Sequence, residues 1–213
     1  MAEKGFKRKL TAILSADVEG YSRLMDDSEE ATIRTLTDYR EAMRNLIQQH
    51  RGRVVDTAGD NLLAEFTSAV DAVNCSVEIQ RELAERNAEL SDDRKMEFRI
   101  GVNVGDVVEE EDRIYGDGVN IAARVEGLSE AGGICITGRA YDQVKNKLEL
   151  GYEYLGEHCV KNISEPVRVY KVLMEPEAVG KVIGEKRFLG RFSRRTALAA
   201  LIILIIVAGG LIS

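Results

Sequence analysis

Residues 1–175 alternate between strand-like and helix-like periodicity, and this alternation limits the possible folds more than any other feature of the sequence. A short apolar run ends at Asp17, and the helical pattern after it opens at a capping box over residues 27–30. Two short apolar segments then flank a turn at Gly59-Asp60, which is typical of a β-hairpin. A second helix begins near Ser68 and leads into another alternating strand. The chain therefore starts with a β-α-β-β-α-β order.

This order predicts an α+β fold, in which a ferredoxin-like antiparallel sheet is flanked by helices. Beyond it, the spacing of Ile121, Val125 and Leu128 predicts a third helix, over residues 117–128, with one apolar face. The remaining predicted elements are a strand at 132–137, a short helix at 138–147 and two strands at 152–160 and 167–173.

The chain ends in a run, residues 197–212, in which every residue is apolar or Gly. Sixteen helical residues span ~24 Å, slightly less than the ~30 Å hydrocarbon core of a bilayer. A buried core helix is the alternative, but the run has no polar face and follows a cluster of arginines. The sequence thus predicts three parts: a folded domain (1–175), a basic juxtamembrane linker (176–195) and a transmembrane helix (196–213), either complete or cut within the span.

Charge and cysteine content exclude several classes of protein and place the folded domain. The positive-inside rule puts the arginine-rich linker, and with it the folded domain, on the cytoplasmic side of an inner or plasma membrane that the chain crosses once. The formal net charge is −7 and the pI about 5.1, so no nucleic-acid partner is expected. None of the three cysteines has C-x-x-C spacing, which argues against a zinc knuckle.

Two aspartates lie where a cation could bind. Asp17 follows an apolar strand and precedes Val18-Glu-Gly-Tyr-Ser22, while Asp60 lies at the tip of the predicted hairpin. A carboxylate beside a Gly turn can hold a cation while backbone N–H groups face a phosphate. Each aspartate alone is more typical of an ordinary turn.

Polar side chains on the third predicted helix form a second candidate group. Asn120 and Arg124 are four residues apart and therefore share one helix face. An arginine there can stabilise charge on a phosphoryl group, and an asparagine can hold a sugar oxygen. A solvated helix face explains the same spacing. Lys161 is either a phosphate ligand or an exposed strand residue.

Taken together, these residues resemble the catalytic domain of class III nucleotide cyclases over about residues 8–174. Ala16–Ser22 is similar to the first metal loop of that family, and Ala58–Asn61 to its second metal turn. Tyr115–Arg124 is similar to its G-[DN]-x-V-N-x-A-x-R helix, and Val160–Asn162 falls where the family has its triphosphate lysine. The order and spacing of all four blocks agree with the family.

The resemblance implies an enzyme that converts a nucleoside triphosphate, ATP as the first expectation, into a 3′,5′-cyclic nucleotide and pyrophosphate for intracellular signalling. Asp17 and Asp60, with the Val18 carbonyl, would hold two Mg²⁺ or Mn²⁺ ions per site. The triphosphate would lie against the backbone near Gly20, Tyr21 and Ser22.

The resemblance also implies a head-to-tail homodimer with a nucleotide site in each half of the interface. Asn120, Arg124 and Lys161 would reach that site from the second subunit, with Asn120 and Arg124 as catalytic residues.

The sequence departs from the family at the two positions that usually read the base. The usual Lys/Asp or Lys/Thr pair appears here as Asp56 and Arg113, with the charges exchanged. GTP or a pyrimidine nucleotide is therefore an alternative substrate to ATP. A catalytically silent, regulatory cyclase-like module is a further alternative, as is an interaction protein that shares only the fold.

Overall fold

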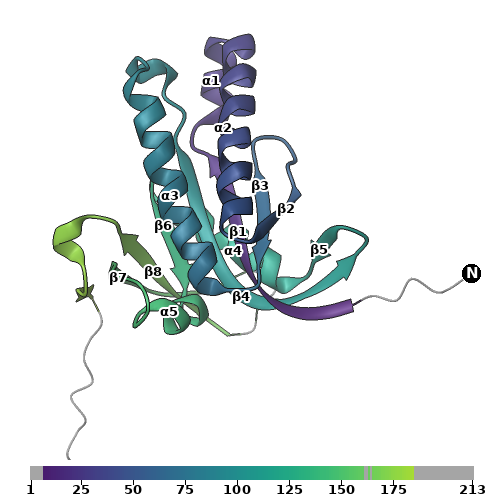
Figure 1. The fold of residues 1–213 in the computed structure, drawn as a ribbon, viewed down its shortest axis with the longest axis vertical. Helices are drawn as coiled ribbons and strands as arrows, with labels where there is room; N and C mark the ends of the chain where they lie inside the picture. Colours follow the sequence, from purple (N-terminus) through teal and green to yellow (C-terminus); the bar gives the residue numbers. More distant parts are fainter. Residues whose placement is uncertain (1–6, 161–162, 164, 185–213) are drawn as a thin grey trace, which may run out of the picture.

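A computed structural model describes residues 7–160, 163 and 165–184 of the chain. Over these residues one sheet of nine strands is flanked by helices (Figure 1). The strands are β1 (Lys7–Val18), β2 (Gly52–Asp56), β3 (Leu62–Phe66), β4 (Phe98–Glu110), β5 (Arg113–Tyr115), β6 (Ile134–Thr137), β7 (Gly151–His158), β8 (Val167–Leu173) and β9 (Val182–Ile183). The helices are α1 (Tyr21–Asp27), α2 (Glu29–Gln49), α3 (Ala69–Ala88), α4 (Asp117–Glu126) and α5 (Gly138–Val144), with 3-10 turns η1 (Asp92–Arg94) and η2 (Pro176–Ala178).

The first four strands form the predicted ferredoxin-like core. They lie in the order β2-β3-β1-β4, and each neighbouring pair is antiparallel. The sheet as a whole is mixed, so the prediction of an antiparallel sheet is wrong beyond this core. β6 runs parallel to β4, and β9 runs parallel to β7. The connection from β4 to β6 passes through α4, and a helical crossover is the usual way to join parallel neighbours.

Helices cover both faces of the central strands. Alternate residues of a strand point to opposite faces, and on β1 Ala12 and Leu14 pack in the main core beneath α2, α3 and α5. Ile13, which lies between them, packs instead with Ala122 of α4 in a second, smaller cluster. Figure 1 shows α2 and α3 beside each other on one face. The face of β1 and β4 opposite α2 and α3 therefore carries α4.

The observed helices and strands differ from the predictions in several places, of which three concern the regions around the site and the predicted linker. Residues 21–27 form α1, which the sequence patterns did not indicate. The predicted capping box is wrong: Ser28, not Asp27, is the N-cap of α2, and its side chain makes no capping hydrogen bond. Residues 176–184 of the predicted linker contain η2 and β9. β9 pairs with β7 and so adds an edge strand to the sheet.

The predicted membrane span, residues 196–213, and residues 185–195 before it lie outside the described residues. Within the described ranges, no helix combines the length and apolar character needed to cross a bilayer.

The closest approach between α4 and the sheet occurs at Gly101 of β4. A Cβ atom at this position would overlap the carbonyl oxygen of Ala122 and the backbone nitrogen of Glu126. We therefore expect Gly101→Ala to lower the free energy of unfolding by at least ~1–3 kcal/mol, because neither backbone atom can move without displacing α4. Urea unfolding measures this change. Gly127→Ala is the matched control, because its Cβ would make only ordinary contacts at the end of the same helix. Equal stabilities of the two variants would contradict the close packing.

Candidate active site

Strand pairing brings Asp17 and Asp60 together at one end of the core. Asp17 is the penultimate residue of β1, and Asp60 lies in the turn that leads into β3. β1 and β3 are antiparallel neighbours, with Ala16 opposite Leu62. The pKa of the Asp60 carboxyl is raised, first by burial, then by a hydrogen bond with the Asp17 carboxyl and by the negative charge of Asp17, while backbone hydrogen bonding acts against this shift. Two acidic groups therefore share a small, partly buried volume.

Arg99 links Asp17 to two further carboxylates. It lies directly opposite Asp17 in the β1–β4 pairing. Its Nη2 lies 3.1 Å from Oδ2 of Asp17 and 3.8 Å from Oε1 of Glu126. Its Nη1 lies 2.8 Å from Oε2 of Glu19. The Arg99 guanidinium thus faces three carboxylates. With Asp60 nearby, its single positive charge does not balance the acidic groups.

Glu126 is a buried acid behind this cluster. Its side chain projects from the end of α4 toward the sheet and is 6% exposed. Ser15 Oγ donates to Glu126 Oε2 at 3.2 Å and accepts from Asn61 Nδ2 at 3.3 Å. Burial and the nearby charge of Asp17 raise the pKa of Glu126 to about 7, although the Ser15 hydrogen bond and Arg99 act in the opposite direction.

The donor set at Asp17 and Asp60 fits a divalent cation. Hard cations such as Mg²⁺ prefer carboxylate and carbonyl oxygens, and usually take only one or two carboxylates from the protein. Among the described residues no group of three or more His, Cys, Asp and Glu side chains gathers as a metal site. Asp17 and Asp60 supply two such carboxylates, and Val18 next to Asp17 is the predicted source of a backbone oxygen.

The predicted triphosphate residues Gly20, Tyr21 and Ser22 follow Asp17 closely. Gly20 adopts φ +69, a left-handed conformation that favours glycine. It is the N-cap of α1, which begins at Tyr21. The turn therefore places the start of α1 directly after the strand end that carries Asp17.

Asn120 and Arg124 lie on one exposed face of α4, as the spacing predicts. The opposite face, with Ala122 and Val125, is buried. Within the described ranges, the side chains of Asn120 and Arg124 make no hydrogen bond or ion pair, so the structure does not bring them against Asp17 or Asp60 of the same chain. Asn103 fixes the start of the helix: its Nδ2 donates to Gly118 O at 2.9 Å, and its Oδ1 accepts from Thr137 Oγ1 at 3.0 Å.

A cavity of about 710 Å³ lies beside the start of α4. Gly116 and Ile121 line it on the α4 side, and Ile163 and Arg168 line it on the side of the β7–β8 connection. Lys161 lies outside the described residues, but the connection that carries it borders this cavity.

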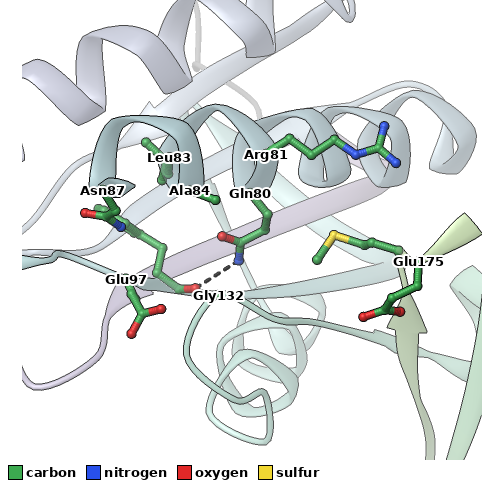
Figure 2. Close-up of a pocket in the computed structure, with 10 residues that line it drawn as sticks. Gln80, Arg81, Leu83, Ala84, Asn87, Glu97, Gly132 and Glu175 are labelled. Carbon is green, nitrogen blue, oxygen red and sulfur yellow. Dashed lines mark hydrogen bonds between the residues drawn. The ribbon is translucent and has the colours of Figure 1, made fainter. Parts of the chain in front are cut away.

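A second cavity, of about 280 Å³, lies between α3 and the starts of β4 and β6 (Figure 2). There Gln80 donates to the carbonyls of Phe98 and Gly133 at 2.9 and 2.8 Å. None of the predicted site residues lines it.

The proposed base-reading residues are not joined in the structure. Asp56 ends β2, and its Oδ1 accepts from the backbone N–H of Thr57 at 2.8 Å. Arg113 begins β5 and is exposed. No ion pair between the two is present in the described part of the chain, so the exchange of charges does not create a pair within one subunit.

Arg99 and Glu126 were not among the site residues predicted from the sequence. Glu126 could have been found, because it lies four residues after Ala122 on the apolar face of a predicted helix, where a carboxylate is unexpected. Arg99 carried no local signal, since its partner Asp17 is 82 positions away.

The raised pKa of Glu126 predicts a pH-dependent stability. The ordinary pKa of a glutamate is 4.5, whereas that of Glu126 in the folded chain is about 7. At pH values between these two, Glu126 keeps its proton in the folded chain but has released it in the unfolded chain. Stability therefore falls as the pH rises through this window. The Glu126→Gln variant lacks this loss, so its free energy of unfolding should exceed that of the wild type increasingly from about pH 5 to pH 8, by roughly 3 kcal/mol at the upper end.

Urea unfolding at a series of pH values, without divalent metal, measures this difference. The exposed Glu41→Gln on α2 is the control and should follow the wild-type profile. Parallel profiles for Glu126→Gln and wild type would contradict the buried, ionisable Glu126.

Comparison with known proteins agrees with this geometry. Residues 7–174 match the family described as the adenylate and guanylate cyclase catalytic domain. Putative adenylate cyclase 3 of Rhizobium meliloti (strain 1021) is 41% identical over 171 residues, which are 80% of this chain and 29% of that protein. The chain thus spans less than a third of that relative's length.

Two solved structures show the same fold. The adenylate/guanylate cyclase/hydrolase from Silicibacter pomeroyi is 38% identical, with a TM-score of 0.75 over 79% of this chain and 99% of that one. The adenylyl cyclase CyaB from P. aeruginosa is 25% identical, with a TM-score of 0.70 over 83% of this chain and all of that one. The predicted resemblance is confirmed: the chain belongs to the adenylate and guanylate cyclase catalytic domain family.

Proposed function

We propose that the chain converts a nucleoside triphosphate, ATP first, into a 3′,5′-cyclic nucleotide and pyrophosphate for intracellular signalling. The observation that carries this proposal is the meeting of Asp17 and Asp60, with the raised pKa of Asp60, within the fold of this family. The charge of two adjacent carboxylates is best offset by a divalent cation together with substrate phosphates.

Two Mg²⁺ or Mn²⁺ ions bound there would lower the pKa of the ribose 3′-hydroxyl and neutralise charge on the phosphates. Asp17 and Asp60 would hold them, with the Val18 carbonyl as a further ligand. Gly20, Tyr21 and Ser22 would orient the triphosphate through their backbone N–H groups.

The second half of the site would come from another copy of the chain. Asn120 and Arg124 face outward on α4, away from buried partners, as groups that serve a neighbouring subunit should. Arg124 would stabilise charge that develops on the transferring phosphoryl group, and Asn120 would orient the ribose. Lys161 would add a positive charge at the triphosphate. A head-to-tail homodimer would contain two such sites.

The choice of nucleotide base depends on two positions that depart from the family. Asp56 and Arg113 replace the usual pair, and they lie on β2 and β5 with no ion pair between them in the described part of the subunit. This departure supports two alternatives, a cyclase that uses GTP or a pyrimidine nucleotide, and a silent regulatory module. The paired aspartates and the outward Asn120 and Arg124 support an active enzyme.

Purified chain assayed with ATP, GTP, CTP and UTP, each with Mn²⁺, tests the reaction and the base together. We expect cyclic nucleotide and pyrophosphate from ATP. Asp17→Asn or Asp60→Asn should lower turnover by at least ~100-fold, because each removes a ligand that acts in the transition state. Matching thermal unfolding curves would show that both variants fold. Product from none of the four nucleotides would favour the silent module, and more than half of the wild-type rate in either variant would exclude the metal assignment.

Mixed dimers test the shared site. Asp17→Asn and Asn120→Ala should each be inactive alone but recover partial activity when mixed, because one of the two sites in a heterodimer contains neither substitution. Native mass spectrometry establishes that heterodimers form. If they form without activity, Asp17 and Asn120 act within one subunit, and the head-to-tail arrangement is wrong.

Membrane attachment through residues 196–213 is also proposed, on the sequence alone. Central Leu and Ile residues each favour insertion by ~0.3–0.6 kcal/mol. The full chain should remain in the membrane fraction after a high-salt wash, and a chain ended after Gly184, which retains β9, should be released. Release of the full chain by salt would contradict insertion.

A further inference from the structure

Two arginines outside the family-like motifs bind at or beside the two proposed metal ligands, Asp17 and Asp60. Arg99 on β4 contacts the Asp17 carboxylate directly, at 3.1 Å. Arg40 on α2 donates from Nη2 to the carbonyls of Gly59 and Asn61, at 2.5 and 2.8 Å. These carbonyls flank Asp60 on both sides.

We propose that Arg40 and Arg99 are positioning residues that hold Asp60 and Asp17 in the geometry that binds the metal. This inference rests on the proposed function and extends it to residues that touch neither the reacting atoms nor the nucleotide.

The two arginines would act in different ways. Arg99 occupies Oδ2 of Asp17 and is itself held by Glu19 and Glu126, so the carboxylate cannot rotate without breaking an ion pair. Arg40 fixes backbone instead. The turn at Gly59 has φ +61 and is closed by a hydrogen bond from Asn61 N to Ala58 O, and Arg40 fastens this turn to α2.

The charge of the two arginines and their proposed positioning role predict opposite changes in metal affinity when either arginine is removed. Both arginines are positive, so their Coulomb effect on a nearby cation is repulsive. If charge alone mattered, removal of either arginine would strengthen metal binding. If positioning matters, removal weakens it, since groups that orient ligating carboxylates typically contribute ~10–100-fold to metal affinity. The direction of the change therefore separates the two explanations.

Mn²⁺ titration of the full chain without nucleotide, followed by the EPR signal of free Mn²⁺, measures binding apart from activity. The variants are Arg40→Lys and Arg99→Lys, which keep the charge but lose the planar fork, and Arg40→Gln and Arg99→Gln, which lose both. Arg34→Gln is the control, because Arg34 lies on the same helix and, among the described residues, pairs only with Glu30 at the surface. Asp17→Asn is the reference for a lost ligand.

We expect each Lys and Gln variant to bind Mn²⁺ at least ~10-fold more weakly than the wild type, with Arg34→Gln unchanged. In the cyclase assay at saturating Mn²⁺, the nucleotide KM should change less than about twofold, which separates metal positioning from a damaged nucleotide site. Thermal unfolding identifies any Gln variant that fails to fold. In that case the Mn²⁺ affinity of the Lys variant at the same position tests the positioning role.

Wild-type affinity in the Lys variants, or tighter binding in the Gln variants, would overturn the proposal while leaving the metal site intact. An effect at one arginine alone would overturn it for the other. If Asp17→Asn also binds Mn²⁺ like the wild type, the metal site of the proposed function is wrong, and the positioning role falls with it.

Discussion

The direct packing of α4 on the backbone of β4 at Gly101 is the contact on which the candidate site depends. Because Gly101 has no side chain, α4 approaches β4 closely enough for the Glu126 carboxylate to reach Ser15 and Arg99 on the sheet. Arg99 in turn contacts Asp17. A hydrogen bond from Asn103, whose amide oxygen accepts from Thr137, secures the other end of the helix, so its orientation is set at both ends. The outward direction of its exposed face follows from this packing.

The same packing concentrates negative charge. Glu126, Asp17 and Asp60 raise one another's electrostatic energy, and this repulsion, added to burial, raises the pKa of Glu126 and of Asp60. Loss of Arg99 would leave these carboxylates uncompensated. Arg99 offsets part of the repulsion, and a bound divalent cation would offset more. The repulsion among these carboxylates is therefore located where the proposed divalent cation would bind.

The sequence predicted much of this arrangement because the relevant signals are local. A strand end and a hairpin turn placed Asp17 and Asp60, and helical spacing placed Asn120 and Arg124 on one face. The parallel β6 was missed because periodicity does not report strand direction. The arginines were missed for a related reason: Arg99 meets Asp17 only through the register of strands 82 positions apart. Residues that position a site from distant parts of the chain leave no pattern in the neighbouring sequence.

The central claim is that each subunit supplies metal ligands to one site and α4 residues to the other. Paramagnetic broadening tests it most directly. An isotope-labelled Asp17→Asn/Asp60→Asn chain, which cannot bind metal, is mixed with unlabelled wild-type chain, Mn²⁺ and a non-cyclisable nucleotide analogue. We predict that the side-chain amide signals of Asn120 in the labelled chain broaden, because the metal held by the partner lies close to them. Sharp Asn120 signals in confirmed heterodimers, with broadening only when label and metal share a chain, would contradict the account.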